Sequence, residues 1–303
     1  STSCRRLATE GRARCTLAVL MQRLYPFLFV FLWSTGFIGA KYGLPYAEPL
    51  SFLLTRYGLV IALMTVIALA TRAPWPERPI QWVHIAVSGV LVHAVYLGGV
   101  FIAIAQGLPA GVTALVVGTQ PLLTAIAAGW LLGDKVDSRQ WFGLGLGFVG
   151  VLLVVSGKLG DGPLFSMLTP ALVALLGITA GTLYQKRYCA RFDLRTGSVI
   201  QFVPTALLTA IAVLLFEDYR IVWSGEFVFA LGWLVLVLSL GAISLLNLLI
   251  RSGSAVNVAS LFYLTPVSTA LIAFLIFGEK LTLTATFGMA LAVSGVYLVA
   301  RPR

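Results

Sequence analysis

Ten long apolar stretches, separated by short segments rich in charge, Pro or Gly, make up most of this 303-residue chain. A transmembrane helix needs about 20 mostly apolar residues, and each stretch has roughly that length. The stretches cover 24–41, 49–70, 80–105, 109–132, 138–156, 164–186, 197–216, 226–250, 254–277 and 282–300. The pattern predicts an all-α integral membrane protein with ten transmembrane helices.

The overall composition agrees with a lipid environment. Hydrophobic residues make up 59% of the chain and charged residues 11%, whereas a soluble domain carries roughly 25% charged residues. The net charge is +10, but the basic residues lie in loops between apolar stretches. This distribution indicates control of membrane topology and argues against a nucleic-acid partner.

The positive charge is distributed unequally between the two sides of the predicted membrane. With ten spans both termini share one side, which would hold 16 of the 21 Lys and Arg residues against four on the other side, with Arg56 inside a span. The positive-inside rule then places both termini in the cytoplasm of a bacterial-type inner membrane. Residues 1–23 are either a targeting peptide or a basic tail, and the tail is the preferred interpretation.

An internal repeat relates the two halves of the chain. A shift of 145 residues aligns Pro121 with Pro266, and 15 of 45 positions are identical between 110–154 and 255–299. The first three helices of each half match only weakly. The aligned Pro, Gly and Lys residues indicate a duplication and not a chance similarity of apolar composition.

The number of helices in each repeat fixes its orientation. We expect a first five-helix repeat at 24–157 and a second at 164–301. Because five is an odd number, the second copy must enter the membrane upside down. Inverted repeats of this kind are a recurring basis for alternating access in transporters.

Two ionisable side chains fall deep inside predicted spans. Arg56 lies about 10 Å below the outer surface and His93 about 20 Å up the third helix, which gives them a similar depth. Arg56 either reaches the lipid headgroups or attracts a substrate carboxylate. His93 either bonds to a neighbouring carbonyl or acts with Tyr96, three residues further on the same face. His93 is also the one mid-span side chain that titrates near neutral pH.

Further candidates are aromatic residues and prolines at mid-span. Trp33 could face lipid, pack in the core or line a cavity. Gln120 and Tyr263 are polar residues near a proline, in the fourth and ninth helices. Pro121 and Pro266 at equivalent positions are either tolerated kinks or a pair of hinges that flank a site.

Several kinds of chemistry are not indicated by the sequence. None of the eleven Asp and Glu residues falls well inside a predicted span, which argues against carboxylate-based proton coupling and against a membrane enzyme. We expect no metal and no cofactor. Cys4, Cys15 and Cys189 lack metal-ligand spacing and are expected to be free thiols, with Cys189 at a helix end facing the cytoplasm.

The segments GVTALVVGTQPLLTAIAAGWLLGDK, NVASLFYLTPVSTALIAFLIFGEK and WSTGFIGAK, together with the lone Arg56, resemble the EamA family of the drug/metabolite transporter superfamily. The resemblance runs from Leu24 to Arg301. It implies ten helices in inverted repeats around a central cavity, both termini inside, and export of amino acids, other metabolites or drugs. The aromatic residues make the chain similar to bacterial aromatic amino-acid exporters. Asp134 departs from the family, which usually has Glu there, and the deep lysines of the nucleotide-sugar branch are absent.

The sequence thus predicts an alternating-access exporter of amino acids or similar small amphipathic metabolites. The alternatives are a drug or cation extruder of the same superfamily and a lipid-linked flippase. A monomer is compatible with this interpretation. The residues assigned to substrate binding are Trp33, Arg56, His93, Tyr96, Gln120 and Tyr263.

Overall fold

The computed structural model describes residues 24–108, 110–131, 133, 135–155, 164–189, 192–252, 255–277 and 282–300. These residues form ten helical rods that follow the ten predicted stretches. The predicted basic tail and the expected repeat boundaries at 157 and 301 lie outside the described residues.

The first half contains five rods, two of which are interrupted. The rods comprise residues 24–43 followed by η1 (Leu44–Tyr46); α2 (Pro49–Ala70); α3 (Pro79–Gly89) continued by η2 (Val90–Leu97) and α4 (Gly98–Ala105); α5 (Ala110–Gly118) continued by α6 (Gln120–Leu131); and α7 (Ser138–Val155).

The second half repeats this order. Its rods comprise α8 (Leu164–Tyr188); α9 (Leu194–Phe216); α10 (Gly225–Trp233) continued by η4 (Leu234–Ala242) and α11 (Ile243–Ser252); α12 (Ala255–Ser260) continued by η5 (Leu261–Tyr263) and α13 (Leu264–Phe277); and α14 (Leu283–Ala300).

The helices have the length and the surface of membrane spans. Within the described residues, six are long and apolar enough to cross a bilayer: Leu24–Tyr46, Pro49–Ala70, Pro79–Ala105, Leu168–Tyr188, Leu194–Phe216 and Gly225–Ser252. Large apolar side chains point outward, among them Leu214 at 84% and Leu275 at 77% exposure. Such a surface is unfavourable in water and suits lipid tails. The protein is thus an all-α membrane protein, as predicted.

The structure shows the repeat even where the sequences match weakly. The third rod of the first half carries the π-helical segment η2, and the third rod of the second half carries the π-helical segment η4. A shift of 145 residues places η2 onto residues 235–242, inside η4. Both fourth rods are also broken just before a proline, at Thr119 and at η5.

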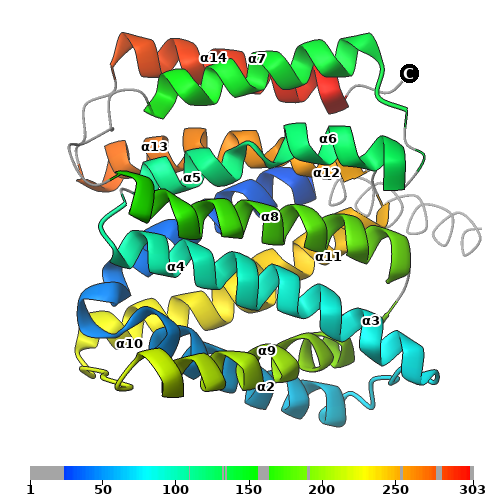
Figure 1. The fold of residues 1–303 in the computed structure, drawn as a ribbon, viewed down its shortest axis with the longest axis vertical. Coiled ribbons are helices and arrows are strands. Elements are labelled where there is room, and N and C mark those ends of the chain that lie inside the picture. Colours follow the sequence, from blue (N-terminus) through cyan, green and yellow to red (C-terminus); the bar gives the residue numbers. More distant parts are fainter. Residues whose placement is uncertain are drawn as a thin grey trace, which may run out of the picture.

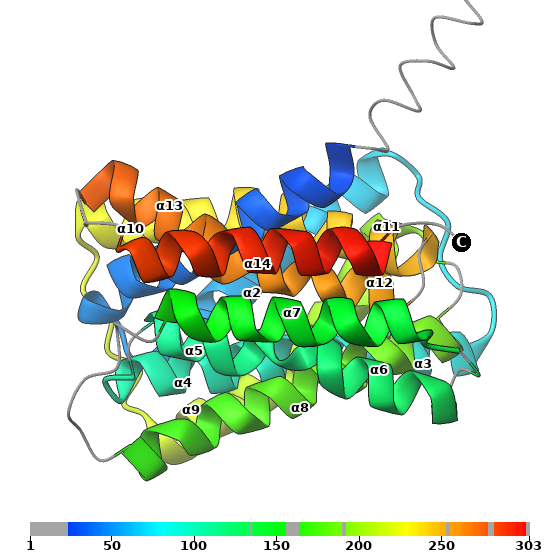
Figure 2. The ribbon, with the colours of Figure 1, turned by 90° about the horizontal axis from the view of Figure 1, so that it is seen from above.

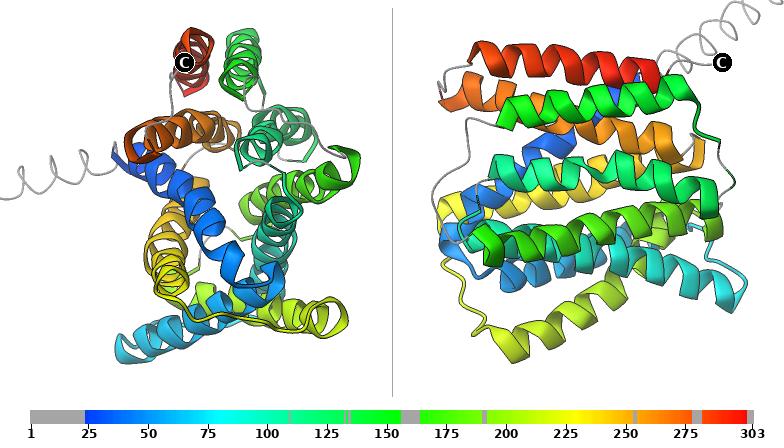
Figure 3. Two further views of the ribbon diagram at one scale, coloured as in Figure 1. Left: turned by 90° about the vertical axis from the view of Figure 1, so that its left-hand side faces the viewer. Right: turned by 45° about the horizontal axis from the view of Figure 1, so that its top comes forward.

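The packing has the same two-fold character. α7 packs along α14, and α2 packs along α9, so equivalent helices of the two halves pair at opposite edges of the bundle (Figure 1). An end-on view shows the first helix crossing obliquely through the middle of the bundle (Figure 3, left). Phe29 and Trp33 on that helix are accordingly buried.

The two ends of the bundle differ. The start of the first helix and the end of α14 lie at the same end (Figure 2), which we call the terminal end and which the positive-inside rule predicts to be cytoplasmic. At the opposite end, Glu217 after α9 accepts hydrogen bonds from Leu50 N at 2.8 Å and Ser51 N at 2.7 Å. An antiparallel bridge joins Ala47 to Ile221 beside it. These contacts cap α2 with a carboxylate from the other half.

Candidate functional site

Arg56 is a buried cation in the first half of α2. Its side chain is 0% exposed, and its Nε donates a hydrogen bond to Ser239 Oγ at 3.0 Å. The two terminal guanidinium nitrogens have no partner among the described residues. A guanidinium carries five N–H donors, and a buried charge is costly unless it is paired. Arg56 therefore retains most of its capacity to bind an anion.

Arg56 and Tyr57 connect the π-helical segments of the two halves. The Tyr57 hydroxyl donates to the His93 carbonyl in η2 at 2.8 Å, while Arg56 reaches Ser239 in η4. Ser239 Oγ in turn donates to the Leu234 carbonyl, five residues earlier, at 3.0 Å. A π-helical turn disturbs the regular backbone ladder and is frequent at functional sites. Here the carbonyls of both π segments accept hydrogen bonds from side chains.

His93 lies against α9, and its backbone carbonyl accepts the hydrogen bond of Tyr57, the neighbour of Arg56 in the chain. Its ring stacks on Phe202 with centroids 4.2 Å apart and planes inclined by 14°. Both ring nitrogens are buried without a hydrogen-bond partner, although the Gln201 amide lies beside the ring. Gln201 Nε2 donates to Ser88 Oγ at 3.1 Å, and its Oε1 has no partner.

An aromatic group adjoins these polar residues. Trp33 stacks nearly parallel to Tyr96, with centroids 6.0 Å apart and planes inclined by 11°, and meets Phe262 edge-on at 5.4 Å. Phe29 packs against both Trp33 and Phe262. Tyr96 follows His93 by one helical turn in η2, so the aromatic group adjoins the polar residues.

Pro121 and Pro266 occupy equivalent positions in the fourth rods of the two halves. Gln120 is buried, and its Nε2 donates to Thr182 Oγ1 at 3.3 Å while its Oε1 has no partner. Ser34 Oγ, next to Trp33, approaches the Thr265 carbonyl at 3.3 Å. The helix breaks before Pro121 and Pro266 follow from the missing backbone donor of proline. Their action as hinges remains a prediction.

Tyr263 turns its ring toward α7. A Cβ at Gly147 would come within 2.5 Å of its ring, so the ring packs against α7. Its hydroxyl is buried without a partner. The structure therefore joins Trp33, Arg56, His93 and Tyr96, places Gln120 beside a helix break, and directs Tyr263 toward another helix.

Several residues of the site were not predicted, among them Phe29 and Phe262 of the aromatic group and Tyr57, Ser239, Gln201 and Phe202. Gln201 and Ser239 are isolated polar residues in apolar spans, a pattern that marks functional positions in membrane proteins. Tyr57 and Phe202 carry no comparable signal, because aromatic residues are common in buried helices. Among the described residues, no group of three potential metal ligands exists.

Comparisons with known proteins agree with this architecture. The model of the EamA-like transporter family matches the chain twice, over residues 21–156 and 165–301. The inner membrane transporter YedA of Escherichia coli, described as uncharacterized, is 26% identical over 90% of this chain and 88% of its own. A protein of Salmonella typhimurium described as a probable amino-acid metabolite efflux pump is 23% identical over 89% and 92%.

A relative from Bacillus subtilis and a solved structure complete the comparison. The uncharacterized transporter YvbV is 27% identical over 89% of this chain and 88% of its own. One crystal structure superposes with a TM-score of 0.73 at 22% identity, over 91% of this chain and 94% of the other, which shows a shared fold. With two family matches that together span most of its length, the chain belongs to the EamA-like transporter family.

Proposed function

We propose that this transporter exports amino acids or similar small amphipathic metabolites by alternating access, with Arg56 as the anchor for the substrate carboxylate. The observation that carries the proposal is the pair of terminal guanidinium nitrogens of Arg56, buried and without partners. A carboxylate would satisfy both nitrogens at once in a bidentate pair.

The other buried groups without hydrogen-bond partners suit the ammonium end of a zwitterion. Gln201 Oε1 and the nitrogens of His93 are buried without hydrogen-bond partners. An amide oxygen and the unprotonated nitrogen of a neutral imidazole both accept hydrogen bonds, so either group could accept one from the substrate ammonium. The aromatic group of Trp33, Tyr96 and Phe262 would then contact an apolar substrate side chain.

The buried cation favours this substrate class over the alternative of a cation extruder. A cationic substrate would face Arg56 without a neighbouring carboxylate, since the described Asp and Glu residues lie in loops or at helix ends. Like charges in a site of low dielectric repel strongly. The name of the Salmonella relative, which mentions amino-acid metabolites, also agrees with a zwitterionic cargo.

The closed packing of the site supports alternating access. Arg56, His93 and Trp33 are buried at 0%, 1% and 4% exposure, so a substrate reaches them only when helices separate. The matched π segments and proline breaks interrupt the helical hydrogen-bond ladder at the same places in each half. Movement at one set would open one side, and movement at the other set would open the other side.

Uptake into proteoliposomes tests the proposal. We would measure flux of a panel of labelled amino acids through the native protein, through Arg56→Gln and through Arg220→Gln, a control at an exposed cation of the opposite end. We expect flux for at least one amino acid, a loss of about tenfold or more in Arg56→Gln, and native flux in the control. Absence of flux for every amino acid through folded protein would contradict the proposal.

The same vesicles test whether His93 carries protons. Flux is measured with and without a pH gradient in the native protein and in His93→Gln. If His93 couples transport to protons, the gradient stimulates the native protein and has no effect on the variant. Flux that ignores the gradient in both proteins would indicate facilitated diffusion.

A further inference from the structure

A pocket lies at the terminal end, apart from the buried site around Arg56. Its volume is about 240 Å³, and it lies between the loop after α2, the start of α3 and the segment before α9. Trp75, Gln81, Ile85 and Phe192 form part of its wall. The volume is below the roughly 300–1,000 Å³ of pockets for drug-sized ligands, which suits a small metabolite.

The rim of the pocket offers both signs of charge beside an aromatic wall. Glu77 and Arg78 are neighbours in sequence and line the pocket together with Asp193, whose carboxylate is paired with Arg195. Neither Glu77 nor Arg78 makes an ion pair with another described residue. Trp75 is held by stacking on Trp82, with centroids 5.4 Å apart, and Trp82 Nε1 donates to the Pro76 carbonyl at 2.8 Å. A carboxylate, a guanidinium and an ordered indole suit a small amphipathic zwitterion.

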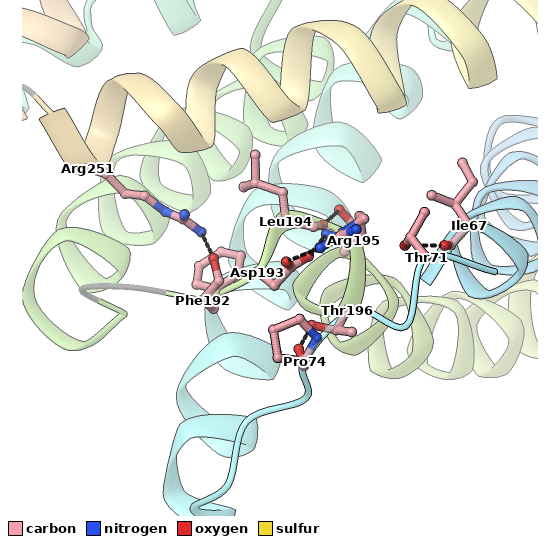
Figure 4. Close-up of polar contacts among 10 residues, drawn as sticks. Ile67, Thr71, Pro74, Phe192, Asp193, Leu194, Arg195, Thr196 and Arg251 are labelled. Carbon is pink, nitrogen blue, oxygen red and sulfur yellow. Dashed lines mark hydrogen bonds and ion pairs between the residues drawn. The ribbon is translucent and has the colours of Figure 1, made fainter. Parts of the chain in front are cut away.

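A separate apolar cluster closes the inner side of this pocket. It consists of Ile85, Cys189, Phe192 and Ile200, all buried and not continuous with the main core. The Arg251 guanidinium lies 4.4 Å from the centroid of the Phe192 ring and donates to the Phe192 carbonyl (Figure 4). Ile85 and Phe192 also line the pocket, so they form the boundary between the pocket and the interior.

Hydrogen bonds connect this cluster to the residues of the buried site. Ser88 Oγ donates to the Ile85 carbonyl at 2.8 Å and accepts the hydrogen bond of Gln201. Gln201 follows Ile200 in the chain and lies beside His93. One face of α3 thus leads from Gln81 in the pocket, through Ile85 in the cluster, to Ser88 at the site, at the spacing of successive helical turns.

We propose that the pocket at the terminal end is the loading site of the transporter, where a small amphipathic zwitterion binds first, and that Ile85, Phe192 and Ile200 form the gate between it and Arg56. The assignment of the ligand rests on the proposed function above. The position of the gate rests on the arrangement of the pocket, the cluster and the site along α3 and α9.

Cys189 in the cluster is a natural reporter of the gate. Burial raises the pKa of its thiol to about 11, and only the thiolate reacts readily with maleimides. With Cys4 and Cys15 replaced by Ser, we would measure the rate at which a maleimide labels Cys189 in proteoliposomes. The gate predicts slow labelling at rest and labelling about tenfold faster during transport, when the cluster separates.

Two variants of α3 make the test independent of any substrate. Ile85→Ala removes part of the cluster, whereas Ile80→Ala changes a side chain of the same helix that is 54% exposed. We expect faster resting labelling of Cys189 in Ile85→Ala and native labelling in Ile80→Ala. Equal labelling of both variants would overturn the gate.

The loading site has its own readout. Glu77→Gln and Arg78→Gln should each raise the substrate concentration that gives half-maximal flux by about threefold to tenfold and leave maximal flux near the native value, because they remove binding energy at an early step. Unchanged half-saturation in both variants would overturn the loading site. If no amino acid is transported but Ile85→Ala still accelerates labelling, the proposed function fails while the gate stands.

Discussion

The close approach of α3 and α9 at Gly89 predicts a specific loss of stability. A Cβ at Gly89 would lie 2.5 Å from both Cα and Cβ of Gln201 and 2.6 Å from its carbonyl oxygen. Ordinary contacts begin at 3.4 Å, so Gly89→Ala must separate the two helices by about 0.9 Å. None of the three atoms can move by a simple side-chain rotation, because they belong to the Gln201 backbone or its first side-chain carbon.

The expected cost of Gly89→Ala is about 1–3 kcal/mol, the usual range for overpacking. Such a loss lowers the Tm by several degrees in a protein of this size. Gly98→Ala is the matched control on the same rod, because a Cβ there would meet nothing within 4 Å. At that position Ala gains helix propensity, so its Tm should be equal to the native value or slightly higher.

Thermal unfolding in detergent, followed by tryptophan fluorescence, compares the two variants with the native protein. Flux should also fall in Gly89→Ala, because the substitution displaces Gln201 beside His93. A Tm for Gly89→Ala equal to or above that of Gly98→Ala would refute the close packing of α3 on α9.

Two further predictions concern the ends of the bundle. Glu217 caps α2 through Leu50 and Ser51, so Glu217→Gln should lower the free energy of unfolding by about 1–2 kcal/mol. Its Tm should therefore be lower than that of Glu226→Gln, and equal Tm values would contradict this role. Arg195 holds the pKa of the Asp193 carboxyl below its ordinary value through a side-chain hydrogen bond, so this contribution is present above about pH 4 and is lost as the pH falls further. Tm measured from pH 6 to pH 3 should therefore fall less in Asp193→Asn than in the native protein, and parallel curves would contradict the ion pair.

The ten helices could be predicted from the sequence because the bilayer imposes a length and a composition on each span. The interruptions inside them could not. η2 and η4 contain mostly apolar sequence, VLVHAVYL and LVLVLSLGA. The hydrogen bond that the His93 carbonyl in η2 accepts comes from Tyr57 on another helix, which the sequence of η2 does not reveal. The breaks before Pro121 and Pro266 were predictable, because proline removes a backbone donor wherever it occurs.

The sequence predicted how deep the candidate site residues lie in the membrane, but not toward which neighbouring helix each side chain points. Helical rise placed Arg56 and His93 at one level, and the structure brings Tyr57 into hydrogen-bond contact with the His93 backbone at that level. The same reasoning could not determine which face of a helix turns inward, because these spans are apolar on all sides. Tyr263 therefore looked equivalent to Tyr96 in the sequence, yet it packs against Gly147 on another helix.

The proposed role of Arg56 is to bind the carboxylate of the substrate. The most direct measurement compares the flux of a transported amino acid with the flux of the corresponding amine, which lacks only the carboxylate, through the native protein and through Arg56→Gln. If Arg56 binds the carboxylate, the native protein prefers the amino acid by about tenfold or more and the variant has lost this preference. The same preference in both proteins would contradict the claim.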